Sequence, residues 1–234
     1  MPTSPVLTVP SLFSPASPPA RPRTPSVWVA DAGREGHRAT RLARTVLDDA
    51  ELERAAAFRD EEARLAYVLA HVALRQLVAA AVGREPRALR LERDPCPGCG
   101  GPHGRPSVTG GAVHFSLSHS GPMVLLALSS TPVGADIERL PGPRTVADVT
   151  RMLHPREAAE LRALDDTDSP LAFARVWTRK EAYLKGLGTG LSDDLSRDYL
   201  GTGEHPAPAP EGWSVTDVAA PDGFAAALAV RTPG

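Results

Sequence analysis

The sequence predicts an α+β fold in which helices and strands are mixed without regular alternation. One observation is a long segment with apolar residues at helical spacing, over residues 50–82. A second is a run of three strand-like segments between residues 113 and 138, and a third is a later helix followed by two further strand-like segments. Because strands and helices do not alternate one by one, this order favours α+β over a doubly wound parallel sheet.

The N-terminal segment, residues 1–25, is rich in Pro, Ser and Thr. Such a composition buries too little apolar surface to offset the entropy of ordering, so we expect a disordered extension. The folded chain is expected to begin with a short strand at residues 27–29. The long helix over residues 50–82 should end at Gly83 and Pro86, which are typical residues after a helix C-terminus.

Turn residues divide the rest of the chain into short elements. Residues 94–111, rich in Pro, Gly and Cys, are expected to form a loop. A helix should start after Ser169, which can cap it, with Pro170 in its first turn, and end at a run of glycines that begins with Gly186. The other expected elements are a helix over residues 155–164 and strands over residues 113–118, 123–129, 133–138, 213–218 and 224–230.

The composition excludes several classes of protein. The 234 residues carry 26 basic and 28 acidic side chains, a net charge of −2. The chain therefore lacks the excess of positive charge that is typical of nucleic-acid-binding proteins. No segment has the ~18 consecutive apolar residues of a membrane span, and the N-terminus lacks the pattern of a secretory signal. The two cysteines, Cys96 and Cys99, fit a reducing compartment, so we expect a cytoplasmic protein. Only two of the basic residues are lysines, Lys180 and Lys185.

An acidic pair lies on the strand predicted over residues 133–138. Asp136 and Glu138 are two residues apart and therefore point to the same face of the strand. Adjacent carboxylates repel each other unless a cation bridges them, and oxygen ligands of this kind suit Mg²⁺. The alternative is a strand end with two solvated acids and Ile137 in the core.

A second candidate motif lies on the helix that follows Ser169. Glu181 and Lys185 are four residues apart and share a helix face, with Trp177 one turn earlier. The glycines after the helix permit close approach of the backbone to a ligand. The alternative is an exposed Glu–Lys pair beside a tryptophan of the core.

Two further motifs precede these. Ser118 and His119 end a predicted strand and could donate hydrogen bonds to a phosphate, or form only the polar rim of a turn. Neighbouring residues on a strand point to opposite faces, so this pair does not form the nucleophile and base of a hydrolase. In the Gly-Arg-Pro sequence at residues 104–106, Arg105 is presented by a rigid loop and suits a phosphate.

Cys96, Cys99 and His103 have the spacing of zinc ligands. A structural zinc site needs four protein ligands, and no second cysteine pair exists, so the fourth would come from His114 or elsewhere. A thioredoxin-like redox motif lacks its strand–helix context here.

The order of these motifs resembles that of the 4′-phosphopantetheinyl transferases, in the longer surfactin-synthetase-activating class. The resemblance covers residues 27–230 and is carried by Gly-Arg-Pro, Ser-His-Ser, Gly-x-Asp-x-Glu and Trp-x-x-Lys-Glu-x-x-x-Lys-x-x-Gly-x-Gly-Leu. It implies a pseudo-dimer of two similar α+β halves, residues 26–131 and 132–234, behind the extension over residues 1–25. The active site would lie at the junction of the halves, so a monomer suffices.

The resemblance also implies the chemistry. The enzyme would transfer the 4′-phosphopantetheine group of coenzyme A to a serine of an apo acyl or peptidyl carrier protein and release adenosine 3′,5′-bisphosphate, with Mg²⁺ as cofactor. Neither a membrane nor a nucleic acid is implied as a partner. Carrier proteins of fatty-acid, polyketide and nonribosomal-peptide synthesis all fit.

Residue roles follow from matching positions in the resemblance. The metal ligands would be Asp136, Glu138 and Glu181. Glu181 would also act as general base, and Lys185 would bind the pyrophosphate. The expected coenzyme A contacts are Arg54, Arg105, Ser118, His119, Lys180 and Lys185, and Arg64 is a further candidate in the first long helix.

Two other functions compete with this one. A module that binds coenzyme A without turnover would share the phosphate contacts, but the third carboxylate, Glu181, favours an enzyme. A small zinc-dependent interaction domain would be centred on Cys96, Cys99 and His103.

Overall fold

A computed structural model describes residues 24–110, 113–189 and 194–232 of the chain. Nearly all of the extension predicted over residues 1–25 lies outside the described residues. The rest is a mixture of helices and antiparallel strands, which confirms the predicted α+β class.

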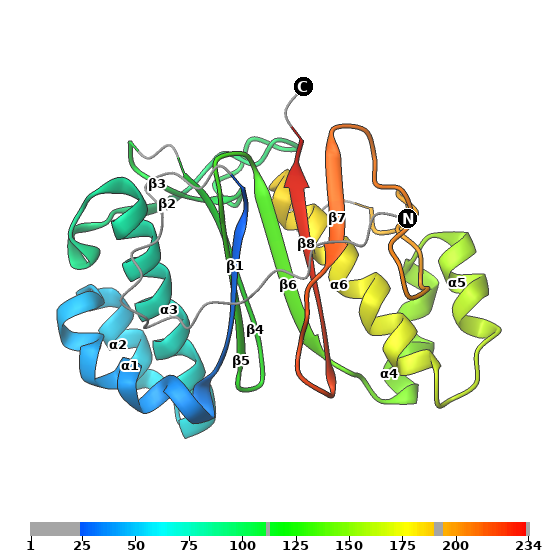
Figure 1. Ribbon diagram of the computed structural model, residues 1–234, viewed down its shortest axis with the longest axis horizontal. Coiled ribbons are helices and arrows are strands. Elements are labelled where there is room, and N and C mark those ends of the chain that lie inside the picture. Colours follow the sequence, from blue (N-terminus) through cyan, green and yellow to red (C-terminus); the bar gives the residue numbers. More distant parts are fainter. Residues whose placement is uncertain (1–23, 111–112, 190–193, 233–234) are drawn as a thin grey trace.

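Two three-stranded antiparallel sheets form the middle of the molecule, and helices cover their outer sides (Figure 1). The first sheet has the order β1-β5-β4 and the second the order β6-β8-β7. In each sheet, the strand that comes first in the sequence pairs with the strand that comes last. The six strands are β1 (Ser26–Asp31), β4 (His114–Ser120), β5 (Met123–Ser129), β6 (Val133–Arg139), β7 (Trp213–Asp217) and β8 (Phe224–Arg231).

Three helices cover the outer face of the first sheet: α1 (Ala32–Val46), α2 (Asp49–Ala57) and α3 (Glu61–Val82). The single helix predicted over residues 50–82 is wrong, because the chain leaves helical geometry at Phe58 and Asp60 caps a new helix through Ala63 N. Asp60 is a preferred N-cap residue, so this break has a local cause. α3 is long and apolar enough to span a membrane, but 72% of its apolar window is buried, against α1 and the first sheet.

The segment predicted as a loop over residues 94–111 contains part of a small two-stranded sheet. β2 (Leu91–Arg93) pairs with β3 (Pro106–Val108), and a short 3-10 turn, η1 (Pro86–Ala88), leads into it. The connection between β2 and β3 carries both cysteines.

One long helix, α6 (Ser169–Leu187), packs on the outer face of the second sheet. It begins at Ser169 after Asp168, not with Ser169 as its cap, and Gly188 ends it at φ +85°. Gly134 of β6 allows the close packing, since a Cβ there would lie 1.9 Å from the Ala182 carbonyl oxygen. The shorter elements of this half are α4 (Pro143–Val149), η2 (Thr150–Met152) and α5 (Pro155–Arg162).

The two sheets meet in two ways. Apolar residues from β1 and β5 form one core cluster with residues from β6 and β8. In addition, serines of β4 bond to the backbone of β6: Ser116 Oγ accepts from Ala135 N at 3.0 Å and Ser120 Oγ from Arg139 N at 3.1 Å. The acidic face of β6 is therefore held against β4 and α6.

Candidate active site

Three carboxylates converge where β6 meets α6. Asp136 and Glu138 lie on the face of β6 that α6 covers, and Glu181 comes from α6 itself. Asp136 is 1% exposed and Glu181 9% exposed. Like charges this well buried are costly unless something positive lies among them.

The electrostatics of the cluster reflect this crowding. Burial, followed by the negative charge of Asp136, raises the pKa of Glu181 to about 7, and Lys185 opposes the shift. Burial also raises the pKa of Glu138, while a hydrogen bond from Ser120 Oγ at 2.8 Å opposes that shift. A cation beside these groups would favour their charged forms.

Lys185 and Ser118 occupy only one oxygen of Asp136. Lys185 Nζ lies 2.5 Å from Asp136 Oδ1 and 3.1 Å from Ser118 Oγ, and Ser118 Oγ donates to the same Oδ1 at 2.8 Å. Within the described residues, Asp136 Oδ2 and Glu181 Oε1 are buried and have no hydrogen-bond partner. Buried polar atoms are rarely left unpaired. Two carboxylate oxygens in this state fit a hard divalent cation such as Mg²⁺.

A cavity of about 860 Å³ lies beside Lys185, and most of its lining comes from α2, α3, β4 and the β2–β3 hairpin, with Lys185 and Gly188 at the end of α6. Its volume falls in the range of small-molecule and cofactor sites. Among the predicted coenzyme A contacts, Arg54, Arg105 and Lys185 line it. Arg105 Nη1 also donates to the Gly186 carbonyl oxygen at 3.0 Å, which connects the β2–β3 loop to the end of α6.

Ser118 and His119, also predicted to contact coenzyme A, are not among the residues that line the cavity. Ser118 Oγ donates a hydrogen bond to Asp136 Oδ1 and so orients that carboxylate. His119 points to the other face of β4, where partial burial and the nearby His71 and Lys185 lower its pKa.

One wall of the cavity comes from α2 and α3, and most of its residues were not predicted from the sequence. The His71 ring stacks on Tyr67 with centroids 4.1 Å apart, and its Nδ1 lies 3.0 Å from Glu51 Oε1. Arg75 is fully buried and donates to Glu51 Oε2 at 2.5 Å and to Asp48. His and Arg four residues apart on an otherwise apolar helix face were the available signal.

Arg64, the other candidate in this helix, faces away from the cavity wall. It pairs with Glu61 on the surface, with Nη2 2.6 Å from Glu61 Oε1. Neither residue is among those that line the cavity.

The prediction that Lys180 contacts coenzyme A is contradicted by its surroundings. Its Nζ lies 2.9 Å from Glu157 Oε2 and donates to the carbonyl oxygens of Leu195, at 2.8 Å, and Asp198. The side chains of Lys180 and Glu157 are 3% and 0% exposed. Successive helix residues point about 100° apart, so Lys180 cannot share the face of its neighbour Glu181.

Known proteins resemble the chain in sequence. A profile of the 4′-phosphopantetheinyl transferase superfamily matches residues 132–216. The 4′-phosphopantetheinyl transferase HetI of Nostoc sp. is 32% identical over 201 residues, which are 81% of this chain and 80% of that protein. The 4′-phosphopantetheinyl transferase Sfp of Bacillus subtilis is 37% identical over 79 residues, 34% of this chain and 35% of that protein.

Among solved structures, a holo-(acyl-carrier-protein) synthase from Bacillus anthracis in complex with CoA (3′,5′-ADP) matches 45% of this chain and 93% of its own. The identity is 16% and the TM-score 0.33.

The chain is thus a transferase, and the similarity to HetI over four-fifths of both proteins defines which kind. It belongs to the 4′-phosphopantetheinyl transferases, the family that the order of its motifs indicated.

The buried Lys180–Glu157 pair should stabilise the fold without contacting substrate. Lys180→Met leaves the Glu157 carboxylate without its cation, and we expect a loss of about 3–5 kcal/mol in the free energy of unfolding, measured by urea denaturation. The double variant Glu157→Leu/Lys180→Met should recover part of that loss. A Lys180→Met protein with unchanged stability and weakened coenzyme A binding would restore the original assignment.

The protonation of Glu181 should couple to cation binding. Because its folded pKa of about 7 lies above the ordinary value, the stability it contributes is present at low pH and is lost as pH rises through about 7. A cation that requires the charged form should stabilise the protein more at about pH 8 than at about pH 6, seen as a larger Mg²⁺-dependent rise in Tm. Glu181→Gln should abolish the difference. An equal Mg²⁺ effect at both pH values in the unmodified protein would contradict this coupling.

Proposed function

We propose that the carboxylate cluster of Asp136, Glu138 and Glu181 is the Mg²⁺ site at which this enzyme moves 4′-phosphopantetheine from coenzyme A to a serine of an acyl or peptidyl carrier protein. The observation that carries the proposal is the pair of buried, unpartnered oxygens, Asp136 Oδ2 and Glu181 Oε1. Membership in the transferase family supports the reaction.

The cavity beside the cluster is suited to the nucleotide end of coenzyme A. Arg54, Arg105 and His71 lie in its wall and offer donors to phosphate oxygens. Lys185 lines the same cavity and reaches the cluster through Asp136, so its ammonium lies between the two. The pyrophosphate would therefore bind beside Lys185, with the adenosine in the cavity.

When bound, Mg²⁺ supplies charge neutralisation at the pyrophosphate and lowers the barrier to breaking its bridging bond. Lys185 Nζ holds the phosphate oxygens and offsets the negative charge that develops on the leaving bisphosphate. Ser118 keeps Asp136 Oδ1 oriented through its 2.8 Å hydrogen bond.

Glu181 takes the proton from the attacking carrier serine, directly or through a water. One of its carboxylate oxygens would hold the cation, and the other would accept the proton. The serine oxygen then bonds to the phosphorus that carries the pantetheine arm, and adenosine 3′,5′-bisphosphate leaves with the electron pair of the broken P–O bond. The protein needs no nucleophile of its own for this step.

We also propose that the chain is a pseudo-dimer, with halves over residues 26–131 and 132–234, which works as a cytoplasmic monomer. The matching strand orders β1-β5-β4 and β6-β8-β7 support two similar halves. A cavity lined from both halves supports one complete site in each chain.

The transfer should depend on the carboxylates. Incubation of the protein with coenzyme A, Mg²⁺ and a panel of apo carrier proteins should add one phosphopantetheine group to a carrier serine, detected by mass spectrometry. Glu181→Gln should lower kcat by about 10²–10⁴-fold, since it removes the base and a metal ligand.

Arg156→Gln, at an exposed position of α5, is the matched control and should retain full rate. Coenzyme A binding without transfer to any carrier, in a folded preparation, would indicate a binding module instead of an enzyme.

Lys185 should not be replaceable by arginine. The larger planar guanidinium does not fit a position 2.5 Å from Asp136 Oδ1 and 3.1 Å from Ser118 Oγ in place of a compact ammonium. We expect Lys185→Arg to lower kcat by roughly 10²-fold in the carrier assay, the cost of losing one charge-stabilising donor. Turnover in Lys185→Arg close to that of the unmodified enzyme would refute this role.

A further inference from the structure

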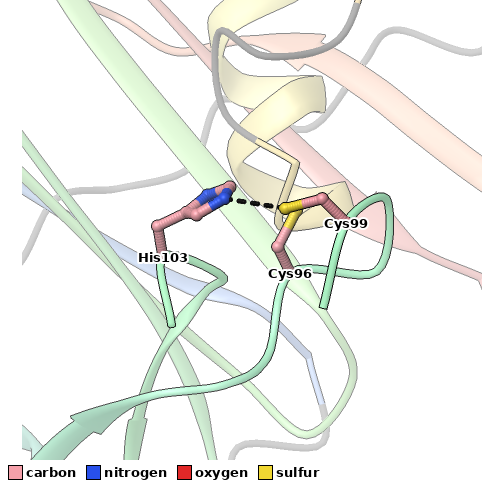
Figure 2. A group of neighbouring side chains, drawn as sticks. All are labelled: Cys96, Cys99 and His103. Carbon is pink, nitrogen blue, oxygen red and sulfur yellow. Dashed lines mark hydrogen bonds between the residues drawn. The ribbon is translucent and has the colours of Figure 1, made fainter. Parts of the chain in front are cut away.

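The loop between β2 and β3 brings three metal-ligating side chains together. Figure 2 shows Cys96, Cys99 and His103 turned toward one another from this one loop. Their sulfur and ring-nitrogen atoms all lie within 4.8 Å of each other, and Cys99 Sγ is 3.0 Å from His103 Nε2. The transferase mechanism uses none of these three side chains.

Backbone hydrogen bonds fold the loop around this cluster. Cys96 N donates to the Gly101 carbonyl oxygen at 2.7 Å, and Gly100 N donates to the Cys96 carbonyl oxygen at 2.8 Å. Gly100 has φ +74°, a conformation that glycine adopts at little cost. A Cβ at Gly101 would lie 3.3 Å from Cys99 Sγ and 3.1 Å from His103 Nε2, so its absence leaves room for the ligating atoms.

We propose that Cys96, Cys99 and His103 bind a zinc ion, with water as the fourth ligand. Thiolate and imidazole are the ligands that zinc prefers. Zn–S and Zn–N bonds of about 2.3 Å and 2.0–2.1 Å in a tetrahedron separate sulfur and nitrogen by about 3.6 Å. Cys99 Sγ and His103 Nε2, now 3.0 Å apart, therefore need to part by only about 0.6 Å.

Water is the fourth ligand because no further protein ligand among the described residues lies close to the cluster and because solvent reaches it. Among the described residues, His114 is not a member of the group whose ligating atoms lie close together. Cys99 and His103 are exposed, so water has access. Three protein ligands and one water is the coordination of zinc in open sites, so this site differs from the closed structural sites that have four protein ligands.

The position of the loop gives the zinc a role at the coenzyme A cavity, a role that rests on the proposed function. His103, Gly104 and Arg105 all line the cavity. Gly104 N donates to the Asp94 carbonyl oxygen at 3.0 Å, and Arg105 reaches across to Gly186 of α6. Zinc would hold the loop in the shape that presents Arg105, and so act as a positioning group and not as a catalyst.

Metal analysis of the full-length protein tests the proposal. The protein is incubated with excess Zn²⁺, passed through gel filtration and measured for zinc. The unmodified chain should retain about one equivalent, and Cys96→Ser/Cys99→Ser and His103→Ala should lose it. His205→Ala, at an exposed histidine outside the cluster, should retain it. With Co²⁺ in place of zinc, the thiolate-to-metal charge-transfer band of the unmodified chain should disappear in the cysteine variant.

Two results would overturn the zinc site. One is a folded, unmodified chain that stays metal-free after loading, whether its cysteines react as thiols or form a disulfide. The other is zinc retained by Cys96→Ser/Cys99→Ser, which would place the metal elsewhere. Carrier modification, measured on the same samples with excess Mg²⁺, separates this question from the proposed function, because metal content is read without any turnover.

Discussion

The burial of negative charge where β6 meets α6 is the constraint on which the rest of the structure depends. Asp136 and Glu181 are almost completely buried, and each retains one oxygen without a hydrogen-bond partner in the described part of the chain. Such a cluster destabilises a fold unless a cation or hydrogen-bond donors offset its charge, since charged oxygens away from water are costly. Lys185 offsets part of the charge through Asp136 Oδ1, and a divalent cation is the group that would offset the remainder.

The packing of α6 and β4 against β6 positions the three carboxylates. Gly134 lets α6 approach β6 closely enough to bring Glu181 to the strand carboxylates. Ser116 and Ser120 of β4 accept hydrogen bonds from the backbone of β6, so the two sheets are joined at the same place. Most of the cavity wall comes from elements between α2 and β4, and the carboxylates come from β6 and α6, so the candidate site combines distant parts of the chain.

The sequence predicted the α+β class and the strand that carries Asp136 and Glu138, but not all of the helices. Strand periodicity placed Asp136 and Glu138 on one face, but only the resemblance to the transferase family joined Glu181 to them. α1 was missed although its buried residues recur at helical spacing, because residues such as Gly36, Ala39 and Ala43 are small and only weakly hydrophobic. The break between α2 and α3 depends on one capping residue, Asp60, inside a stretch that is otherwise helical in pattern.

The two lysines show that the role of a residue can depend on partners that are distant in the sequence. Both stand out in an arginine-rich sequence, and both were expected at the pyrophosphate. Lys180 instead meets Glu157 and two loop carbonyl oxygens, partners that lie 15 to 23 residues away along the chain and have no local signal. In both places a compact ammonium fits a narrow set of oxygen acceptors better than a planar guanidinium would.

The most direct measurement is a crystal structure of the protein soaked with Mn²⁺ and coenzyme A, with the metal located by anomalous scattering. The account predicts one anomalous peak within bonding distance of both Asp136 Oδ2 and Glu181 Oε1, with the pyrophosphate beside Lys185. A peak that leaves both of these oxygens unpartnered, or a cluster that stays metal-free while coenzyme A is bound and transferred, would contradict it.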